Sequence, residues 1–558
     1  MKELRPLEGF PLDLRSPGVD EVALSYAIDQ FGQVAIDNVM ATHHRSEASS
    51  ERMYTDVMGY DRVFRNSKVR SEASYQMAVE SVRKQLIPAE KLVPLTLGAA
   101  EQHPNFPQDR SPGLPWTLRG YKKKRDCLQD PVARKSWHNK WDRIGRGKVE
   151  NLPDVSLFFR AQIAKVGEHK IRSVWGYPID VMVEESRFFY PYLEWLKNAE
   201  HNVPIAYQVE MATGGMAYIQ QIIDKHRGTT FLVGDWSKFD KTIPPWLIKT
   251  AFQILAEAFR YDRVVDSEGK EWPVAAVQSR RRYQRLVRYF IRTPVRLPNG
   301  TRFRKEGGVP SGSMFTNLVD SIVNMIVCRY LLYEVTGFYP SGEIYLGDDS
   351  FCACEGTVNL DDIATLADEK FGMILNTNKS YVTTKPYNVH FLGYYCIEGR
   401  PMKPQDFLIA SFIYPERVVK TNEVRVSRAL GQMWSTMDRA RARPWFGIVE
   451  RMMIDFGIDR DTMMSYIHSH PGQFKYLRIL GITNQMIRLP VCSAEGDVPE
   501  VDPPSVPRRD YRPEKFDLDA LMYQVHIRTM KKSEFEEEDS DADSGFDDMS
   551  TTSDDDKG

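Results

Sequence analysis

The sequence predicts an α+β fold, and the order of elements in its middle third supports this class. Residues 229–236 form an apolar run that ends at a turn, as expected for a buried strand. Helical stretches follow at 244–259 and 314–333, and two short apolar runs flanking Gly-Asp-Asp at 347–349 indicate a hairpin. A further helix and a strand pair complete the series. The order strand, helix, helix, hairpin, helix, strand pair favours an α+β domain over a doubly wound sheet.

Local signals mark each element in chain order. Pro244 and Pro245 suit the start of the first helix, and the stretch WLIKTAFQILAEAF repeats its apolar residues at helical spacing. The last helix of the domain is expected at 361–373 and the strand pair at 387–397. From about 404 to 490 the pattern is mostly helical.

Composition indicates a globular protein. No run of eighteen uncharged apolar residues occurs, which argues against a membrane-spanning helix. The first residues lack the apolar stretch of a secretion signal. The six cysteines show no metal-finger spacing, so we expect reduced thiols and a cytosol-like compartment.

The net charge of −2 hides a strong asymmetry. Residues 534–558 hold twelve Asp or Glu and one Lys, a net of −11, which leaves +9 for residues 1–533. A basic body suits a polyanionic partner. The acidic tail predicts disorder, and five prolines within 497–513 predict an extended segment before it.

Two carboxylate clusters follow predicted strands. Asp235 and Asp240 belong to the sequence DWSKFD after the buried strand, and Asp348 and Asp349 occupy the hairpin tip. Oxygen ligands suit Mg²⁺ and Mn²⁺. Two such ions together activate an attacking hydroxyl and stabilise a leaving oxygen. Taken alone, Gly-Asp-Asp is equally typical of a type I′ turn without chemistry.

A glycine- and serine-rich loop lies between the clusters and runs into the second helix. Gly312 and its neighbouring glycines let a ligand approach the backbone, and the helix start offers N–H donors. Thr316, Asp320 and Asn324 follow at i, i+4 and i+8, so they line one face of that helix. They either face a ligand or form a solvated polar stripe. No P-loop motif occurs.

The ordered set DWSKFD, SGSMFTNLVDSIVN, YLGDD, LNTNKS and VHFLGYYC resembles motifs A to E of viral RNA-dependent RNA polymerases. It is most similar to polymerases of small double-stranded RNA viruses, the partitiviruses and picobirnaviruses. The motifs span about 235–396, and upstream likenesses reach back to 111. The resemblance implies a right hand of fingers, palm and thumb, with a ferredoxin-like antiparallel palm sheet and largely helical fingers and thumb.

The same resemblance divides the chain. The expected parts are an N-terminal segment with fingers at 1–228, a palm at 229–400 with a finger insertion at about 260–305, a thumb at 401–495, an extended segment at 496–533 and a disordered acidic tail at 534–558. The implied partners are RNA template and product, NTPs and a viral capsid protein, without a membrane. The implied location is the virion interior and the host cytoplasm.

The resemblance also assigns catalytic roles. Asp235, Asp348 and Asp349 are the expected ligands of two Mg²⁺ ions, with Mn²⁺ as a substitute. Lys379 matches the motif D lysine, a candidate to protonate the departing pyrophosphate, although an exposed loop lysine fits equally well. Asp240 is expected near the ribose of the incoming nucleotide.

Other matching residues are expected to bind the nucleotide. Ser311 and Gly312 form a mobile loop, and Thr316 and Asn324 help to recognise the sugar, whose 2′-hydroxyl separates RNA from DNA. One position departs from the pattern. Asp320 stands where the wider polymerase group often has Asn, which leaves open the groups that read this hydroxyl.

The segment KVGEHKIRSVWG at 165–176 resembles motif F, whose cations hold the triphosphate. Arg172 is the first candidate because its forked donors match phosphate oxygens, followed by Lys170 and Lys165. A solvated basic strand face would look the same. Residues 111–116 resemble motif G, which guides the template.

Two further basic runs are KKKR at 122–125 and SRRRYQRLVRYFIR at 279–292, and the second interleaves cations with aromatic residues. They line a template or nucleotide channel through phosphate contacts and stacking, or they are solvated helix faces. We assign Trp236 and Phe239 to the core.

The sequence therefore predicts an RNA-dependent RNA polymerase that transfers NTPs to the 3′-hydroxyl of RNA by two-metal catalysis, for viral genome replication and transcription. The first alternative is a reverse transcriptase. A reverse transcriptase would be expected to have a bulky aromatic residue at the position of Asp240, so Asp240 argues against it. The second is a non-catalytic RNA-binding protein with a polymerase-like fold, which would be expected to lose a metal aspartate. A Mg²⁺ phosphohydrolase leaves the motif F cations unexplained.

Overall fold

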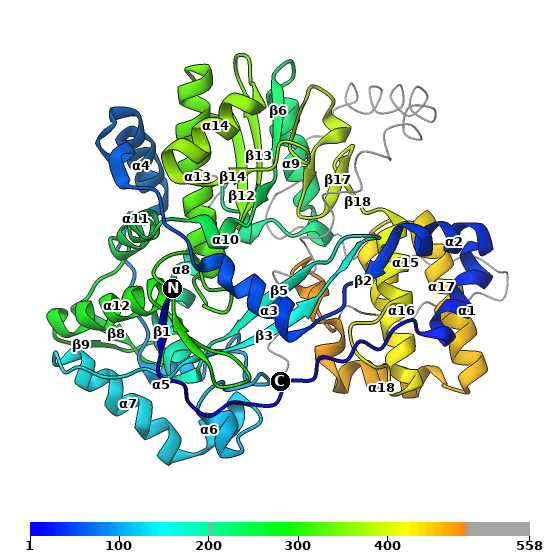
Figure 1. Cartoon of the computed structure of the whole chain (residues 1–558), viewed down its shortest axis with the longest axis horizontal. Coiled ribbons are helices and arrows are strands. Elements are labelled where there is room, and N and C mark those ends of the chain that lie inside the picture. Colours follow the sequence, from blue (N-terminus) through cyan, green and yellow to red (C-terminus); the bar gives the residue numbers. More distant parts are fainter. Residues whose placement is uncertain (200–202, 486, 488–558) are drawn as a thin grey trace.

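The computed structural model describes residues 1–199, 203–485 and 487, so the predicted segments 496–533 and 534–558 lie outside the described residues. Figure 1 shows a sheet-containing mass at the top, a mixed lobe at the lower left and a helical lobe at the right. In the terms of the predicted right hand these are the palm, the fingers and the thumb.

The palm is built on a four-stranded antiparallel sheet in the order β12-β13-β6-β15. Its strands are β6 (Thr230–Gly234), β12 (Gly342–Leu346), β13 (Asp349–Cys354) and β15 (Tyr381–Thr383). Helix α13 (Thr316–Thr336) precedes β12, and α14 (Leu360–Phe371) joins β13 to β15. Chain order and sheet order are those of a ferredoxin-like unit, so the predicted palm elements are confirmed.

Burial explains why these elements form. The central strand β6 is apolar on both faces, with Phe231, Leu232 and Val233 all buried, as expected for a strand covered on both sides. Helix α13 is buried along most of its length, including Asp320 and Asn324. The interpretation as a solvated polar stripe is therefore wrong. Trp236 and Phe239 are buried too, which confirms their assignment to the core.

The fingers contain a five-stranded sheet in the order β1-β11-β10-β3-β5. Its strands are β1 (Lys2–Leu4), β3 (Val155–Ala161), β5 (Ile171–Gly176), β10 (Pro294–Arg296) and β11 (Arg302–Arg304). The surrounding helices include α6 (Lys124–Gln129), α7 (Pro131–Gly145), α8 (Ile179–Asn198), α11 (Pro245–Ala256) and α12 (Ala276–Ile291). Most of this lobe precedes β6 in sequence, and α11, α12, β10 and β11 are inserted between β6 and the palm helix α13.

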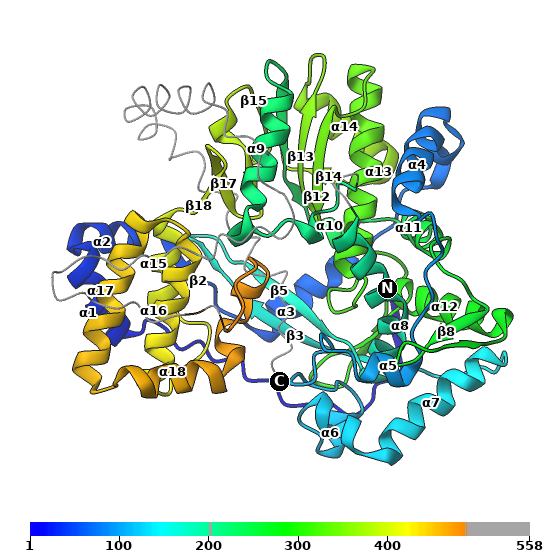
Figure 2. The same ribbon diagram turned by 180° about the vertical axis from the view of Figure 1, so that it is seen from behind.

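The thumb lobe consists of α15 (Gln405–Ile413), α16 (Asn422–Thr436), α17 (Arg439–Phe456) and α18 (Arg460–Ser469), as the helical pattern predicted. Two N-terminal helices, α1 (Glu21–Phe31) and α2 (Gln33–Thr42), pack on it. Arg160 near the tip of β3 pairs with Glu416 at 3.1 Å. Figure 2 shows β3 and β5 reaching from the fingers to the thumb, which closes the hand.

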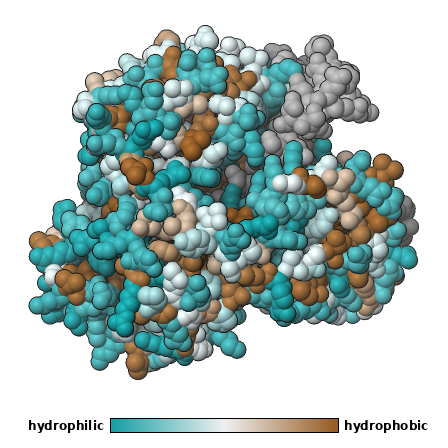
Figure 3. Space-filling view, viewed as in Figure 1, coloured by the Kyte–Doolittle hydropathy of each residue, from teal (hydrophilic) through white to brown (hydrophobic). Residues whose placement is uncertain are grey.

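The surface and the cysteines agree with the composition. On the face shown in Figure 3 hydrophilic residues prevail, and hydrophobic residues are scattered in small groups. Within the described ranges no helix is long and apolar enough to cross a membrane. Cys127, Cys328, Cys352, Cys354 and Cys396 are free and buried, as expected for reduced thiols, and Cys492 lies outside the described residues.

Candidate active site

The predicted metal-binding carboxylates lie at the end of β6 and in the turn between β12 and β13. Asp235 directly follows β6, while Gly347 and Asp348 form the two-residue turn of the hairpin, because Leu346 pairs with Asp349. Strands β6 and β13 are antiparallel neighbours, so the end of one lies beside the start of the other. Gly347 has a φ of +61° and Asp348 is not in the positive region, so the turn belongs to type II′ and not to type I′.

The carboxylates at these two positions lie close enough to repel one another. Burial raises the pKa of Asp348 to about 6, and the charges of Asp240 and Asp235 also raise it, while Arg172 acts in the opposite direction. Burial, then Asp348 and Asp235, hold the pKa of Asp349 well above its ordinary range. Such mutual repulsion in a partly desolvated site is relieved by a bound cation.

This donor set fits Mg²⁺ or Mn²⁺ in an open site. Within the part of the chain that the structure describes, no three His, Cys, Asp or Glu side chains form a closed metal-binding group. Mg²⁺ is commonly held by one or two carboxylates together with substrate phosphates and water. Asp235 and the hairpin aspartates therefore suit a metal that shares its ligands with a nucleotide.

Cations face the carboxylates from two lobes. Burial raises the pKa of Asp235, and the charges of Lys379, Lys170 and Arg172 lower it. Burial lowers the pKa of Lys170 to about 8, and repulsion by Lys379 contributes. The structure thus brings Lys379 from the palm together with Lys170 and Arg172, which lie just before and on β5. Lys165 ends β4 (Ile163–Lys165), which pairs with β2 (His43–Arg45) outside the sheet of β5.

The glycine- and serine-rich loop packs against β5. The Ser311 hydroxyl accepts a hydrogen bond from the backbone N–H of Trp175 at 3.1 Å and donates to the carbonyl of Ser173 at 3.4 Å. A Cβ at Gly312 would lie 1.6 Å from the Trp175 carbonyl oxygen, so this close approach requires glycine. In this conformation the loop is fixed to the strand that carries Arg172.

The polar face of α13 supports the hairpin turn. The Asn324 amide donates to the carbonyls of Gly347 at 3.1 Å and Asp349 at 3.2 Å, and its oxygen accepts the indole N–H of Trp236 at 3.1 Å. Asn324 therefore positions the turn that carries Asp348, and its contact with a sugar stays a prediction. Thr316 donates its hydroxyl hydrogen back into the preceding loop.

Asp240 and Asp320 form a carboxyl pair beside this helix. Asp320 is 4% exposed, and its Oδ1 has no hydrogen-bond partner among the described residues. Burial, then the charge of Asp240 and a hydrogen bond with it, raises the pKa of Asp320 well above its ordinary range. Burial also raises the pKa of Asp240, which the bond to Asp320 lowers. The raised pKa of Asp320 favours its protonated form, which can donate a hydrogen bond to Asp240.

Comparison with known proteins places this geometry in a family. Residues 21–433 match the family model for viral RNA-dependent RNA polymerase. The chain belongs to this family. The chain is 26% identical over 330 residues to an RNA-directed RNA polymerase of White clover cryptic virus 1, and 28% identical over 307 residues to one of Cryptosporidium parvum virus 1. Each match covers 53% of this chain and 53% of the relative, so the chain spans about half the length of these relatives.

Solved polymerase structures share the fold. The RNA-dependent RNA polymerase of a human picobirnavirus matches with a TM-score of 0.60 and 14% identity, covering 86% of this chain and 90% of that one. A Sicinivirus 3Dpol polymerase matches with a TM-score of 0.62 and 15% identity, covering 86% of this chain and 100% of that one. The right-hand fold predicted from the sequence is confirmed.

A carboxylate outside the polymerase motifs joins the two halves of the site. Asp56 on α3 (Ser50–Val57) accepts hydrogen bonds from the Lys241 ammonium and, at 2.8 Å, from the backbone N–H of Ser173. Lys241 is adjacent to Asp240, and Ser173 is adjacent to Arg172. Asp56 thus sets the position of the expected sugar-binding segment relative to the expected triphosphate-binding strand.

A second unexpected carboxyl group holds the glycine- and serine-rich loop from behind. Glu185 on α8 accepts hydrogen bonds from the Ser313 hydroxyl and, at 3.2 Å, from the backbone N–H of Met314. Burial raises the pKa of Glu185 to about 8. Neither Asp56 nor Glu185 belongs to a motif, and a single acidic residue within a helix gives no sequence signal of such a role.

The basic run at 122–125 also has a structural role. Lys124 is fully buried, and its ammonium group donates to the carbonyl of Ser111 at 2.6 Å. It therefore supports the segment that resembles motif G from inside the protein. Both interpretations of this run, as a solvated helix face and as a channel lining, are therefore wrong for Lys124.

Proposed function

We propose that this chain is an RNA-directed RNA polymerase that transfers NTPs to the 3′-hydroxyl of RNA on an RNA template, in viral genome replication and transcription. One observation carries the proposal. The palm carboxylates at the end of β6 and in the hairpin turn face three cations, Lys170, Arg172 and Lys379. A metal-bound triphosphate between these halves satisfies both charges. Family membership supports the same activity.

The residues of the chain act mainly by binding and orientation. Asp235, Asp348 and Asp349 would hold divalent ions, Mg²⁺ or its substitute Mn²⁺, which activate an attacking hydroxyl and stabilise the leaving oxygen. Arg172 and Lys170 neutralise and orient the triphosphate. Lys379 would supply the proton to the departing pyrophosphate. Positioning and charge neutralisation provide most of the rate in phosphoryl transfer.

Sugar selection is assigned to the carboxyl pair. With Asp320 protonated and donating to Asp240, the remaining lone pairs of Asp240 accept a hydrogen bond from the 2′-hydroxyl of an NTP. A deoxynucleotide would leave this buried acceptor unpaired, which disfavours it. The pair thus replaces the Asp and Asn expected from the family pattern.

The partners beyond RNA and NTPs follow from the family resemblance alone. A viral capsid protein as partner and a location in the virion interior and host cytoplasm are proposals of this kind. Co-sedimentation of the chain with capsid protein from infected material would test both, and a chain found only outside particles would contradict them.

RNA synthesis by the purified chain tests the activity. A short RNA template with labelled NTPs and Mg²⁺ should give template-length product. Asp348→Ala should reduce the rate by about 100-fold or more, whereas the matched control Asp368→Ala changes an exposed α14 carboxylate that only pairs with Arg65 and should act as wild type. Equal use of dNTPs would favour a reverse transcriptase. No product from folded protein, even with Mn²⁺ and a primer, would favour a non-catalytic RNA-binding protein.

A further inference from the structure

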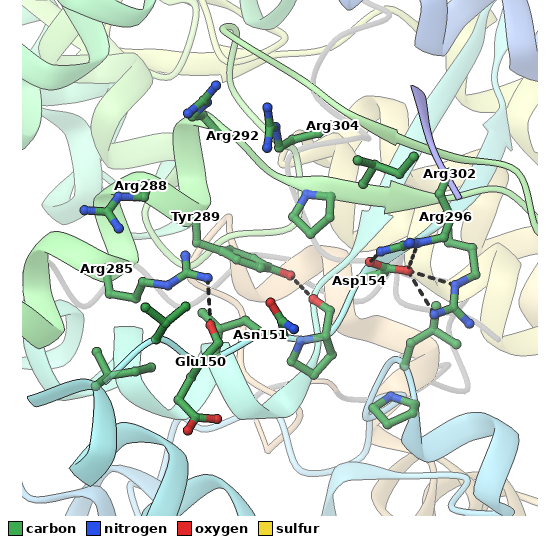
Figure 4. Close-up of a pocket in the computed structure, with 18 of the residues that line it drawn as sticks. Glu150, Asn151, Asp154, Arg285, Arg288, Tyr289, Arg292, Arg296, Arg302 and Arg304 are labelled. Atoms are coloured by element: carbon green, nitrogen blue, oxygen red, sulfur yellow. Dashed lines mark hydrogen bonds and ion pairs between the residues drawn. The ribbon is translucent and has the colours of Figure 1, made fainter. Parts of the chain in front are cut away.

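A cavity of about 860 Å³ lies in the fingers, and none of the residues predicted for the active site lines it. Its walls come from α12, the β10–β11 hairpin, the segment 147–154 between α7 and β3, and residues Leu4 and Leu7 at the N-terminal strand. Figure 4 shows arginine side chains on both sides of this cavity. We refer to it as the arginine cavity.

The lining of the arginine cavity is strongly basic. Eight lining residues carry positive side chains and two carry carboxylates, which leaves a net of six positive charges. Glu306 lies outside the lining and pairs with two of the arginines, so it offsets one more positive charge. The eight cationic residues are Lys148, Arg281, Arg285, Arg288, Arg292, Arg296, Arg302 and Arg304.

Helix α12 contributes three of these cations from one face, and a fourth, Arg292, directly follows the helix. Arg281, Arg285 and Arg288 are spaced by four and three residues, which places them in one row along the helix. On a helix surface, residues at this spacing have Cβ atoms about 5–6 Å apart. Arg292 caps the C-terminal end of the helix. The aromatic side chains of α12 are buried, so the base stacking expected for this run is wrong.

The arginines on the other side of the cavity are fixed in place. Arg296 and Arg302 share the carboxylate of Asp154, at 2.9 and 2.6 Å, and each also donates to a backbone carbonyl near the N-terminus. Asp154 is 4% exposed. One carboxylate therefore orients two guanidinium groups without neutralising both, as Figure 4 shows.

The cations of α12 are less well compensated. Within the described ranges, neither Arg285 nor Arg288 forms an ion pair, and Arg285 donates only to the carbonyl of Glu150 at 3.4 Å. Burial, followed by repulsion from Arg288, lowers the pKa of Arg285. Lys148 is exposed and likewise makes no ion pair with the described residues. Like charges held together in this way are stabilised by an anion.

We propose that the arginine cavity binds the phosphate backbone of single-stranded RNA at a site separate from the catalytic carboxylates. A row of guanidinium groups matches successive phosphates of one strand. Tyr289 is the aromatic residue of the lining, and its hydroxyl donates to the Pro153 carbonyl at 2.6 Å inside the fold. Binding through phosphates without stacked bases is independent of sequence.

The position of the cavity favours RNA over other polyanions. Leu114 and Pro115, from the segment that resembles the template-guiding motif G, lie in its wall. The main rival is the chain's own acidic tail at 534–558, whose net charge is −11. The RNA assignment rests on the proposed function, because it takes RNA as the polymer that the protein handles.

The test measures the affinity of the full chain for a labelled 20-nucleotide single-stranded RNA over a range of salt concentrations, without NTPs. The variant Arg285→Gln/Arg288→Gln removes two charges from the cavity. The matched control Arg260→Gln/Arg263→Gln removes two charges from the nearby hairpin region, where both arginines form exposed ion pairs. If two phosphate contacts are lost, the slope of log K against log salt falls by about 1.4. The control should keep the wild-type slope.

Two further measurements make the result decisive. Lys148→Gln/Arg288→Gln changes only exposed side chains, so it keeps the test valid if the first variant does not fold, and it should lower the slope by a similar amount. Oligouridylate and oligocytidylate of equal length should bind equally well. A slope unchanged in both cavity variants would overturn the proposal, and a rise in RNA affinity would assign the cavity to the acidic tail instead. RNA synthesis measured in parallel on a short template distinguishes a failure of the proposed polymerase activity from a failure of the cavity assignment.

Discussion

The carboxylate cluster in the palm and the arginine cavity in the fingers both gather like charges, but they compensate them differently. In the palm, Asp235, Asp348 and Asp349 repel one another, and cations from β5 and the palm face them. In the arginine cavity, one carboxylate orients Arg296 and Arg302, while Arg285 and Arg288 of α12 form no ion pair with the described residues. The first region is prepared for a cation and an anion together, and the second for an anion alone.

This difference separates two kinds of binding site. The palm site has opposite charges close together, so it can order a metal, a triphosphate and the residues around them in one geometry. The arginine cavity presents one sign of charge along a helix, which holds a backbone without fixing a reacting atom. Changes in the palm should therefore affect chemistry, and changes in the cavity should affect RNA retention.

The largest expected effect compares one charge from each region. Asp235→Asn should lower the rate of single-nucleotide addition on a saturating short template by about 100-fold or more, because the proposed metal ligand loses its charge. Arg288→Gln should leave this rate within about twofold, since saturating RNA compensates for a lost phosphate contact. Rapid-quench measurement of the first addition checks both. An equal loss of rate in the two variants would indicate that the two regions act as one functional site.

The next effect concerns the carboxyl pair at the edge of the palm cluster. Asp320→Asn should keep the preference for NTP over dNTP within about threefold, because an amide N–H replaces the carboxyl proton that bonds Asp240. Asp320→Ala leaves a buried carboxylate partner without its donor, which costs about 1–3 kcal/mol and should reduce the preference by about 10- to 100-fold. Competitive incorporation of NTP and dNTP measures this ratio. Loss of the preference in Asp320→Asn would show that a carboxyl group itself is required.

Most of the palm was predictable because its signals are local. An apolar strand ends next to Asp235, and a hairpin turn contains Gly347. In both places a few neighbouring residues predict the local structure and its chemical role. The turn type was not predictable, because Gly-Asp fits type I′ and type II′ alike and only the φ of Asp348 separates them. The role of Asn324 depended on how α13 packs under the turn, which no local pattern contains.

The arginine cavity shows what the sequence could not reveal. The run at 279–292 indicated cations and aromatics, but not that the aromatics face the core while the arginines face a cavity. The remaining cavity walls come from segments near residues 4, 114, 150 and 300, far apart in the chain. The same holds for Asp56, whose partners Ser173 and Lys241 are more than a hundred residues away.

An intermediate effect is expected where Asp56 joins fingers to palm. Asp56→Asn removes a charge-assisted bond to Lys241, so the KM for NTPs should rise by about tenfold while kcat changes less. Lys241→Met should give a similar rise, and the double variant should not add to it. Steady-state kinetics check this, with the exposed Asp37→Asn on α2 as the control. Additive effects of the two changes would indicate that Asp56 and Lys241 act separately.

The smallest effect is on stability and lies behind the glycine- and serine-rich loop. The buried Glu185 has a pKa of about 8 in the folded chain, against an ordinary value of 4.5. A carboxyl group whose pKa is raised by folding contributes stability that is full below its ordinary pKa and is lost as pH rises through the folded pKa. The wild-type chain should therefore lose stability between about pH 5 and pH 8 through this group.

Glu185→Gln keeps the shape of the side chain and cannot ionise, so its stability relative to wild type should grow from pH 5 to pH 8 and then level off. Thermal melting across this range checks the trend. The control Glu194→Gln changes an exposed residue of the same helix and should follow wild type at every pH. A constant difference between Glu185→Gln and wild type would mean that Glu185 is already ionised in the folded chain. In that case a charged Glu185 carboxylate holds the loop. It would then add negative charge near the palm site, beside Asp235 and the aspartates of the hairpin.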